Sequence, residues 1–140
     1  MKTVIRVQDK DGRGMFQMCT EDNKRNKSVY YIKGLEELSE RHDTLPTVYD
    51  DILINKAFDE ELGYKSFDSM DYKDSKWRFS FKSITQFEKW VKREEVTILN
   101  KNGYSILKIE ATNVIESEFQ SIFDINSVVS VVDITNLFTN

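Results

Sequence analysis

The sequence predicts an α+β fold: a single small domain over residues 1–140, in which a mostly antiparallel sheet carries two to four helices on one face. The length suits one hydrophobic core, since a chain of this size buries roughly two-thirds of the surface that it exposes when unfolded. The composition, 39% hydrophobic against 31% charged, supplies enough apolar surface to offset the entropy of folding. Runs typical of strands lie near both ends, with helical patterns between them.

The N-terminal region predicts a strand, a turn and a returning strand. Residues 3–8 hold a β-branched apolar run that is typical of a strand. The glycines at positions 12 and 14 permit positive φ, so residues 9–14 predict a turn and residues 15–18 a second short strand. Residues 20–28 contain no apolar side chain and predict a surface loop.

Two helices and a loop are expected in the middle of the chain. Residues 34–42 predict a short helix that ends before Pro46, whose ring disfavours helical geometry at the preceding residue. Residues 48–62 fit a second helix, with Gly63 placed to end it. Residues 65–76 are mostly polar and predict a surface loop.

The clearest strand signal follows, because aromatic and polar residues alternate over residues 77–82 and predict a strand with one aromatic face. Ser83 and Gln86 have the spacing of a capping box, so a helix is expected to begin there. Its apolar face comprises Ile84, Phe87, Trp90 and Val91.

The last third of the chain predicts further strands. Residues 94–103 leave two structures open: a short helix, which we favour, and a strand that ends in an Asn-Gly hairpin. Residues 104–109 and 119–123 are typical of strands, and the valine- and isoleucine-rich residues 128–138 are expected to close the sheet.

Composition excludes several classes of protein. No apolar run is long enough to span a bilayer and the N-terminus lacks the pattern of a signal peptide, so we expect no membrane association and a cytoplasmic location. The single cysteine, Cys19, and the single histidine, His42, exclude an intrachain disulfide and a cysteine-rich zinc site. No cofactor and no metal site are predicted.

The charge is uneven along the chain. Residues 1–35 carry eight Lys/Arg and four Asp/Glu, residues 36–74 four and twelve, and residues 75–140 eight and eight, giving +4, −8 and 0. Direct nucleic-acid binding is therefore unlikely, because it needs a basic face. The acidic segment, residues 36–74, suggests a nucleic-acid mimic as one alternative, although such charge runs more often serve only to solubilise a surface.

Four short motifs carry a resemblance to a known family. Residues 5–16 contain Ile-Arg-Val and Gly-Arg-Gly-Met-Phe, and residues 80–91 contain Ser-Phe-Lys-Ser followed by phenylalanine and Trp-Val. Residues 103–104 are Gly-Tyr, and residues 116–123 contain Glu-Ser-Glu-Phe-Gln and a final phenylalanine. In this order they resemble a family of small uncharacterised proteins encoded by bacteriophages and prophages. The likeness covers nearly the whole chain.

The resemblance implies a phage origin and an accessory role in infection, within the host cytoplasm. This chain departs from the family pattern at Met15 and Ser80, and its acidic middle is longer. We expect action by binding a host protein, with a defence component as one such partner, and a homo-oligomer remains open. Exposed aromatic and acidic residues of the acidic segment are the expected contacts. They are Tyr49, Asp50, Asp51, Asp59, Glu60, Glu61, Tyr64 and Tyr72.

A second alternative is an NAD-dependent ADP-ribosyltransferase-like enzyme, since the order of Arg, Ser and Glu-x-Glu motifs resembles that class. Arg6 would hold the pyrophosphate of NAD, Ser80 or Ser83 would shape the nicotinamide pocket, and Glu118 would stabilise positive charge on the ribose. Glu116 would share a face with Glu118 if both lie on one strand. Such acid pairs are common, and an exposed strand face is the simpler interpretation.

Other reactive residue types have simpler structural interpretations. His42 is expected at a surface or helix end, Cys19 as a semi-buried small residue, and residues 12–14 as a turn rather than a phosphate loop. The aromatic residues of the second half are expected in the core rather than on a base-stacking platform. They are Trp77, Phe79, Phe81, Phe87 and Trp90.

Overall fold

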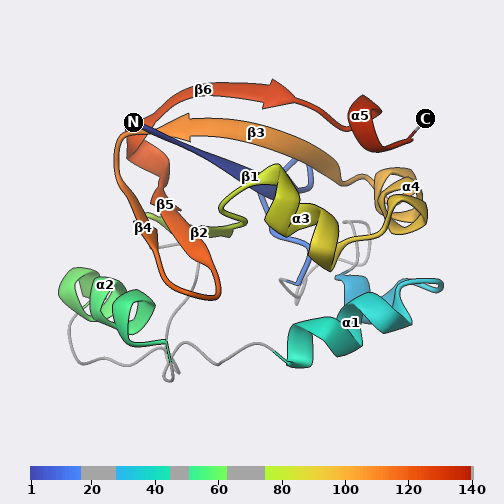
Figure 1. The fold of residues 1–140 in the computed structure, drawn as a ribbon, viewed down its shortest axis with the longest axis horizontal. Helices are drawn as coiled ribbons and strands as arrows, with labels where there is room; N and C mark the ends of the chain where they lie inside the picture. Colours follow the sequence, from blue (N-terminus) through green and yellow to red (C-terminus); the bar gives the residue numbers. More distant parts are fainter. Residues whose placement is uncertain (17–27, 45–50, 63–74, 140) are drawn as a thin grey trace.

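The computed structural model describes residues 1–16, 28–44, 51–62 and 75–139, whose strands form two small antiparallel sheets (Figure 1). The first sheet has the order β1-β3-β6, with β1 at Lys2–Gln8, β3 at Ser105–Ala111 and β6 at Val128–Asp133. The second has the order β2-β5-β4, with β2 at Trp77–Ser80, β5 at Ser121–Asp124 and β4 at Val114–Glu116.

Five α-helices lie in the described ranges. They are α1 (Glu36–Asp43), α2 (Ile52–Leu62), α3 (Ile84–Trp90), α4 (Arg93–Lys101) and α5 (Asn136–Thr139), and short 3-10 turns occur at Val29–Tyr31 and Ile125–Ser127. Four helices, all except α2, contribute buried apolar side chains to the largest core cluster, against the first sheet. These side chains include Leu38, Phe87, Leu99 and Phe138, which join Ile5, Val7 and Ile106 of the sheet.

Helix α2 packs elsewhere. It belongs to a second cluster on the second sheet, in which Ile54 and Phe58 lie against Trp77 and Ile122. Figure 1 shows α2 beside the β4–β5 hairpin, on the side of the molecule away from β6. The inward side chains of this helix follow helical spacing, so one face is buried and the opposite face is left to solvent.

The two sheets are joined where β2 ends. The amide of Ile5 on β1 donates to the carbonyl of Phe81 (2.9 Å), and the amide of Phe81 donates back to Ile5 (2.7 Å). A third cluster includes buried Val4 and Ile109 of the first sheet and Phe123 of the second. Backbone pairing and apolar packing together therefore connect the sheets.

The predicted α+β class is confirmed, and several elements lie where the sequence indicates. Helix α1 occupies most of residues 34–42, and Ser83 caps α3 by accepting a hydrogen bond from the amide of Gln86 (3.1 Å). Residues 94–101 lie in α4, and the chain leaves this helix through Asn102 and Gly103, the latter at φ +88°. Favouring a helix there was correct, because a positive φ suits the glycine that ends a helix.

Three local predictions are wrong. The first is the strand predicted over residues 15–18, because Met15 and Phe16 lie in a turn and residues 17–18 lie outside the described ranges. In the described residues before it, the returning chain pairs with β1 through a single bridge between Gln8 and Gly14. Residues 77–82 have no single aromatic face, because Phe81 packs on the first core cluster while Phe79 packs on the second. The C-terminal tail is not all strand, since β6 ends at Asp133 and α5 follows.

The reason for the last difference is local. The Asp133 carboxylate accepts hydrogen bonds from the amide (2.9 Å) and the hydroxyl (2.6 Å) of Thr135, which turns the chain out of the sheet. Asp133 therefore ends the strand. No helix in the part of the chain that the structure describes is long and apolar enough to cross a membrane.

Candidate functional site

Arg6 of the N-terminal motif holds the fold together from inside. Its side chain is only 4% exposed, and its guanidinium donates to the carbonyls of Phe79 (2.7 Å) and Gly12 (2.9 Å) and to the side chain of Gln8 (2.8 Å). Burial, together with the nearby charge of Arg78, lowers the pKa of Arg6 to about 9, while Asp9 acts in the opposite direction. All three nitrogens of the guanidinium therefore donate to groups of the protein itself rather than to a ligand.

The turn after β1 is built by Asp9. One oxygen of its buried carboxylate accepts from the amides of Asp11 and Arg13, both at 2.9 Å, and Gly12 has φ +82°. A Cβ at Gly14 would stand 3.6 Å from the Arg6 guanidinium, in ordinary contact. The prediction that residues 12–14 form a turn is confirmed, and the motif supports Arg6 rather than a phosphate.

The late motif forms the turn between β4 and β5 and docks α2. The amide of Ser117 donates to the carbonyl of Gln120 (2.8 Å), which closes the turn. The Ser117 hydroxyl (2.7 Å) and the Gln120 side-chain amide (2.9 Å) both donate to one carboxylate oxygen of Asp51, the residue before α2. Ser117 and Gln120 are therefore structural residues of the hairpin.

This turn also separates the two glutamates of the late motif. Glu116 ends β4 and lies 3.6 Å from the ammonium group of Lys2, whereas Glu118 is exposed in the turn. The premise that both lie on one strand and share a face is wrong, because the chain reverses between them. The predicted strand over 119–123 accordingly begins only at Ser121.

Ser80 is committed to the core of the second sheet. It is buried, and its hydroxyl hydrogen-bonds with the hydroxyl of Ser121 on β5 (2.7 Å). Of the side chains named for the transferase alternative, which are Arg6, Ser80, Ser83, Glu116 and Glu118, Ser83 and Glu118 lie beside a cavity. Arg6, Ser80 and Glu116 do not line it.

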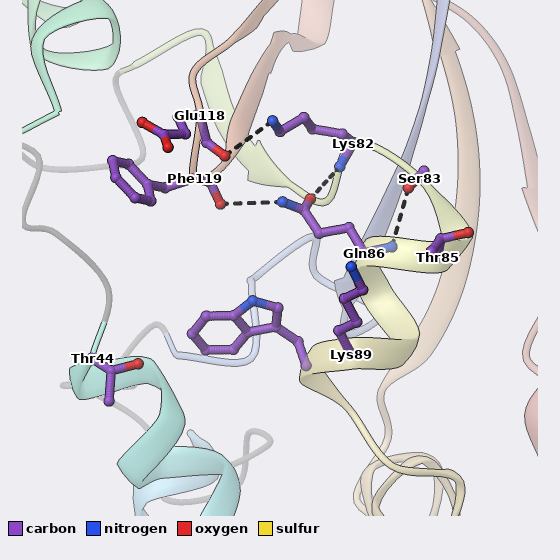
Figure 2. A pocket seen from close by; sticks show the side chains of 9 residues that line it. Thr44, Lys82, Ser83, Thr85, Gln86, Lys89, Glu118 and Phe119 are labelled. Carbon is purple, nitrogen blue, oxygen red and sulfur yellow. Dashed lines mark hydrogen bonds between the residues drawn. The ribbon is translucent and has the colours of Figure 1, made fainter.

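That cavity is an open hollow of about 600 Å³ between α3 and the β4–β5 turn (Figure 2). It is lined by Thr44, Lys82, Ser83, Thr85, Gln86, Lys89, Trp90, Glu118 and Phe119. Two hydrogen bonds hold its walls together: Lys82 donates to the carbonyl of Glu118 (3.1 Å), and the Gln86 side chain donates to the carbonyl of Phe119 (3.2 Å).

The lining of the cavity combines aromatic and charged side chains. Trp90 and Phe119 offer aromatic surface, Lys82 and Lys89 offer positive charge, and Glu118 adds a carboxylate. Sequence reasoning missed this site, because it assigned Trp90 to the core and gave Lys89 no role. The only available signal was Trp90 at the edge of the apolar face of α3, beside Lys89.

His42 has the structural position expected for it. It lies near the end of α1 and stacks on Phe16 with 3.8 Å between ring centroids, and its Nδ1 lies 2.5 Å from the hydroxyl of Tyr30. Burial lowers the pKa of His42, opposed by the charge of Asp43. Within the described ranges, no three His, Cys, Asp or Glu side chains are grouped so that they could hold a metal ion.

The expected partner contacts have mixed outcomes. Tyr49, Asp50, Tyr64 and Tyr72 lie outside the described residues, as does Cys19. Asp51 is 4% exposed and holds the hairpin, so its selection as a surface contact was wrong. Glu61 is half-buried and accepts a hydrogen bond from the amide of Lys76 (3.0 Å). Asp59 and Glu60 are exposed on α2, as a contact role requires.

The outer face of α2 also carries apolar side chains that sequence reasoning left out. Ile52 is 80% exposed and Leu53 is 52% exposed, while the next residue, Ile54, is completely buried. On the same helix, Lys56 lies 3.9 Å from Glu60, an exposed pair that contributes little stability. We call the exposed residues Ile52, Leu53, Lys56, Asp59 and Glu60 the α2 outer face.

The fold and these sites define a small α+β protein in which Arg6, Asp9, Ser117 and Gln120 of the terminal motifs support the fold. The chain belongs to the bacteriophage T4 Y00F protein family, whose model matches residues 1–136. The phage origin implied by the motifs is thereby confirmed, and the protein is a bacteriophage accessory protein. Comparisons with curated proteins and with solved structures gave no significant match.

Proposed function

We propose that this phage protein acts by binding a protein of the bacterial host, and that the α2 outer face makes the contact. The observation that carries the proposal is the exposure of Ile52 and Leu53 at the first turn of α2. Two large aliphatic side chains side by side in water are costly to leave uncovered, and each contributes about 1.5–3 kcal/mol when it is fully buried. A partner surface supplies that burial.

The charge of the same face indicates the chemistry of the partner. Asp59 and Glu60 lie about two turns along α2 from Ile52 and Leu53, within the acidic segment of net charge −8. A complementary surface would hold an apolar pocket with Lys or Arg side chains at one end. We place host defence proteins among the partners to test first, because the role is accessory to infection.

Affinity purification from host lysate tests this proposal when wild type is compared with matched variants. The variant Ile52→Ser/Leu53→Ser is expected to bind the captured protein at least about tenfold more weakly, since loss of 1.4 kcal/mol corresponds to a factor of ten. Asp59→Asn/Glu60→Gln should weaken binding and reduce its dependence on salt.

Two controls separate a specific contact from a general surface effect. Leu137→Ser changes an exposed apolar residue on α5, away from α2, and Glu88→Gln/Glu94→Gln removes exposed acids from α3 and α4. Both controls should bind as wild type does. Capture of no host protein, or capture that survives the α2 changes, would contradict the proposal.

The two alternatives stay hypotheses. Neither an acidic nucleic-acid mimic nor a transferase gains support from the described side chains, and for the transferase Ser83 and Glu118 border a cavity that Arg6 does not line. Titration of NAD into the wild-type protein and into Glu118→Gln tests the transferase alternative.

A further inference from the structure

The outer strand of the first sheet has one unpaired edge. Strand β6 pairs with β3 on one side, and no described strand lies on its other side (Figure 1). The opposite edge of the sheet, at β1, is partly covered, because Ile5 pairs with Phe81 and Gln8 with Gly14. The two edges of this sheet are therefore not equivalent.

The middle of β6 has little protection against pairing with another strand. The strand reads Val-Val-Ser-Val-Val-Asp, and Val129, Val131 and Val132 are 59%, 53% and 52% exposed. Exposed edges are commonly protected by charged side chains, by proline or by a bulge. In β6 the register shift lies opposite Glu110 and Ala111, at the beginning of the strand, and the one charged residue, Asp133, lies at its end. Ser130, Val131 and Val132 between them form a regular edge without charge.

The backbone of that second half points outward at Val131. The amide of Ile134 donates to the carbonyl of Ile106 on β3 (2.8 Å), so residue 134 directs its backbone groups toward the sheet. Because these directions alternate along an antiparallel strand, Val132 also faces β3, while Val131 and Asp133 direct their N–H and C=O groups away from it. A partner strand could satisfy these groups.

We infer that β6 pairs antiparallel with β6 of a second copy of this chain, about a two-fold axis at Val131. The strand complements itself in this arrangement: Val131 lies opposite Val131, and Val132 lies opposite Ser130. The two Asp133 carboxylates then lie at opposite ends, whereas parallel pairing would set them side by side. The contact is isologous and continues the sheet to six strands across two copies.

The concentration dependence of the mass in solution tests this inference on the full chain. By sedimentation equilibrium, wild type is expected to pass from the monomer to the dimer mass as its concentration rises. Val131→Lys should stay monomeric at the same concentrations, because it sets two like charges opposite each other. Leu137→Lys changes an equally exposed apolar residue on α5 and should dimerise as wild type does.

Cross-linking gives a second readout that does not depend on the lysine variant folding normally. In a Cys19→Ser background, a short bifunctional maleimide should link Val131→Cys into a covalent dimer, since directly opposed Cβ atoms lie about 4.5–5.5 Å apart. Leu137→Cys should not. A wild type that stays monomeric up to millimolar concentration would overturn the inference, and so would a dimer that Val131→Lys leaves intact or that both cysteines link equally. Helix α2 packs on the second sheet and β6 belongs to the first, so the two proposals use different surfaces and fail independently.

Discussion

At the scale of single residues, Arg6 and Asp9 of the N-terminal motif stabilise the backbone around them. Arg6 satisfies two carbonyls that come from different parts of the chain, Gly12 and Phe79. Asp9 organises the intervening turn and places its carboxylate near the guanidinium. A buried carbonyl that loses its hydrogen-bond donor still bears the free-energy cost of its removal from water. The stability of the fold therefore depends on Arg6.

Replacing Arg6 is expected to destabilise the protein strongly. Arg6→Met keeps much of the side-chain volume but removes all three donors, and the free energy of unfolding should fall by about 2–4 kcal/mol. Urea denaturation followed by circular dichroism measures this change. Lys10→Met, an exposed site in the same turn, should stay within about 0.5 kcal/mol of wild type. An Arg6→Met protein as stable as wild type would show that the guanidinium does not serve the fold.

At the scale of elements, the contacts that hold α2 in place matter most, because this helix carries the outer face that is proposed to bind the partner. The helix contacts the rest of the described protein through its buried face and through Glu61, which accepts from the amide of Lys76. It is also held by Asp51, which accepts from Ser117 and Gln120 of the hairpin. The same carboxylate lies 3.5 Å from the amide of Ile54 in the first turn. A single side chain therefore both caps α2 and orients its outer face.

Asp51→Ala is expected to loosen α2 without unfolding the rest of the molecule. Loss of the cap costs about 1 kcal/mol, and the Ser117 hydroxyl and the Gln120 amide lose their acceptor. Amide hydrogen exchange should therefore become faster in α2 than in wild type, while α4 keeps its protection. Asp59→Ala, an exposed site on the same helix, serves as the comparison and should leave both rates unchanged. Equal acceleration in α2 and α4 would argue against a local role.

At the scale of the whole molecule, the connection between the sheets determines how the protein unfolds. The paired amides of Ile5 and Phe81 and the bond from Arg6 to Phe79 tie the second sheet to β1, the strand that contributes Ile5 and Val7 to the main core. Separating the sheets would expose Phe123 and Ile109 together. The two sheets should therefore unfold as one cooperative unit.

Each of the two tryptophans reports on a different hydrophobic cluster. Trp77 lies in the cluster of the second sheet and Trp90 packs against the main core. In the single-tryptophan variants Trp90→Phe and Trp77→Phe, fluorescence and far-ultraviolet circular dichroism should show the same urea midpoint. In either variant, a fluorescence transition that precedes the loss of secondary structure would mean that the sheets separate before global unfolding.

Much of the local structure could be predicted because its causes lie within a few residues. Three examples act over a few residues: the cap at Ser83, the glycine after α4 and the β-branched run of β1. The candidate site could not be predicted in the same way. Glu116 and Glu118 look like neighbours on one strand, yet the Ser117–Gln120 turn sends them to different places.

The sequence by itself determined the α+β class, the phage resemblance and the position of most helices and strands, because these follow from local periodicity and short motifs. Only the tertiary structure decided that the strands divide into two sheets, that Arg6 and Asp51 are internal supports, and that α2 and β6 present apolar surface. The physical reason is distance along the chain. Arg6 bonds to a carbonyl 73 positions away and Asp51 to a hydroxyl 66 positions away, and no local pattern encodes such partners.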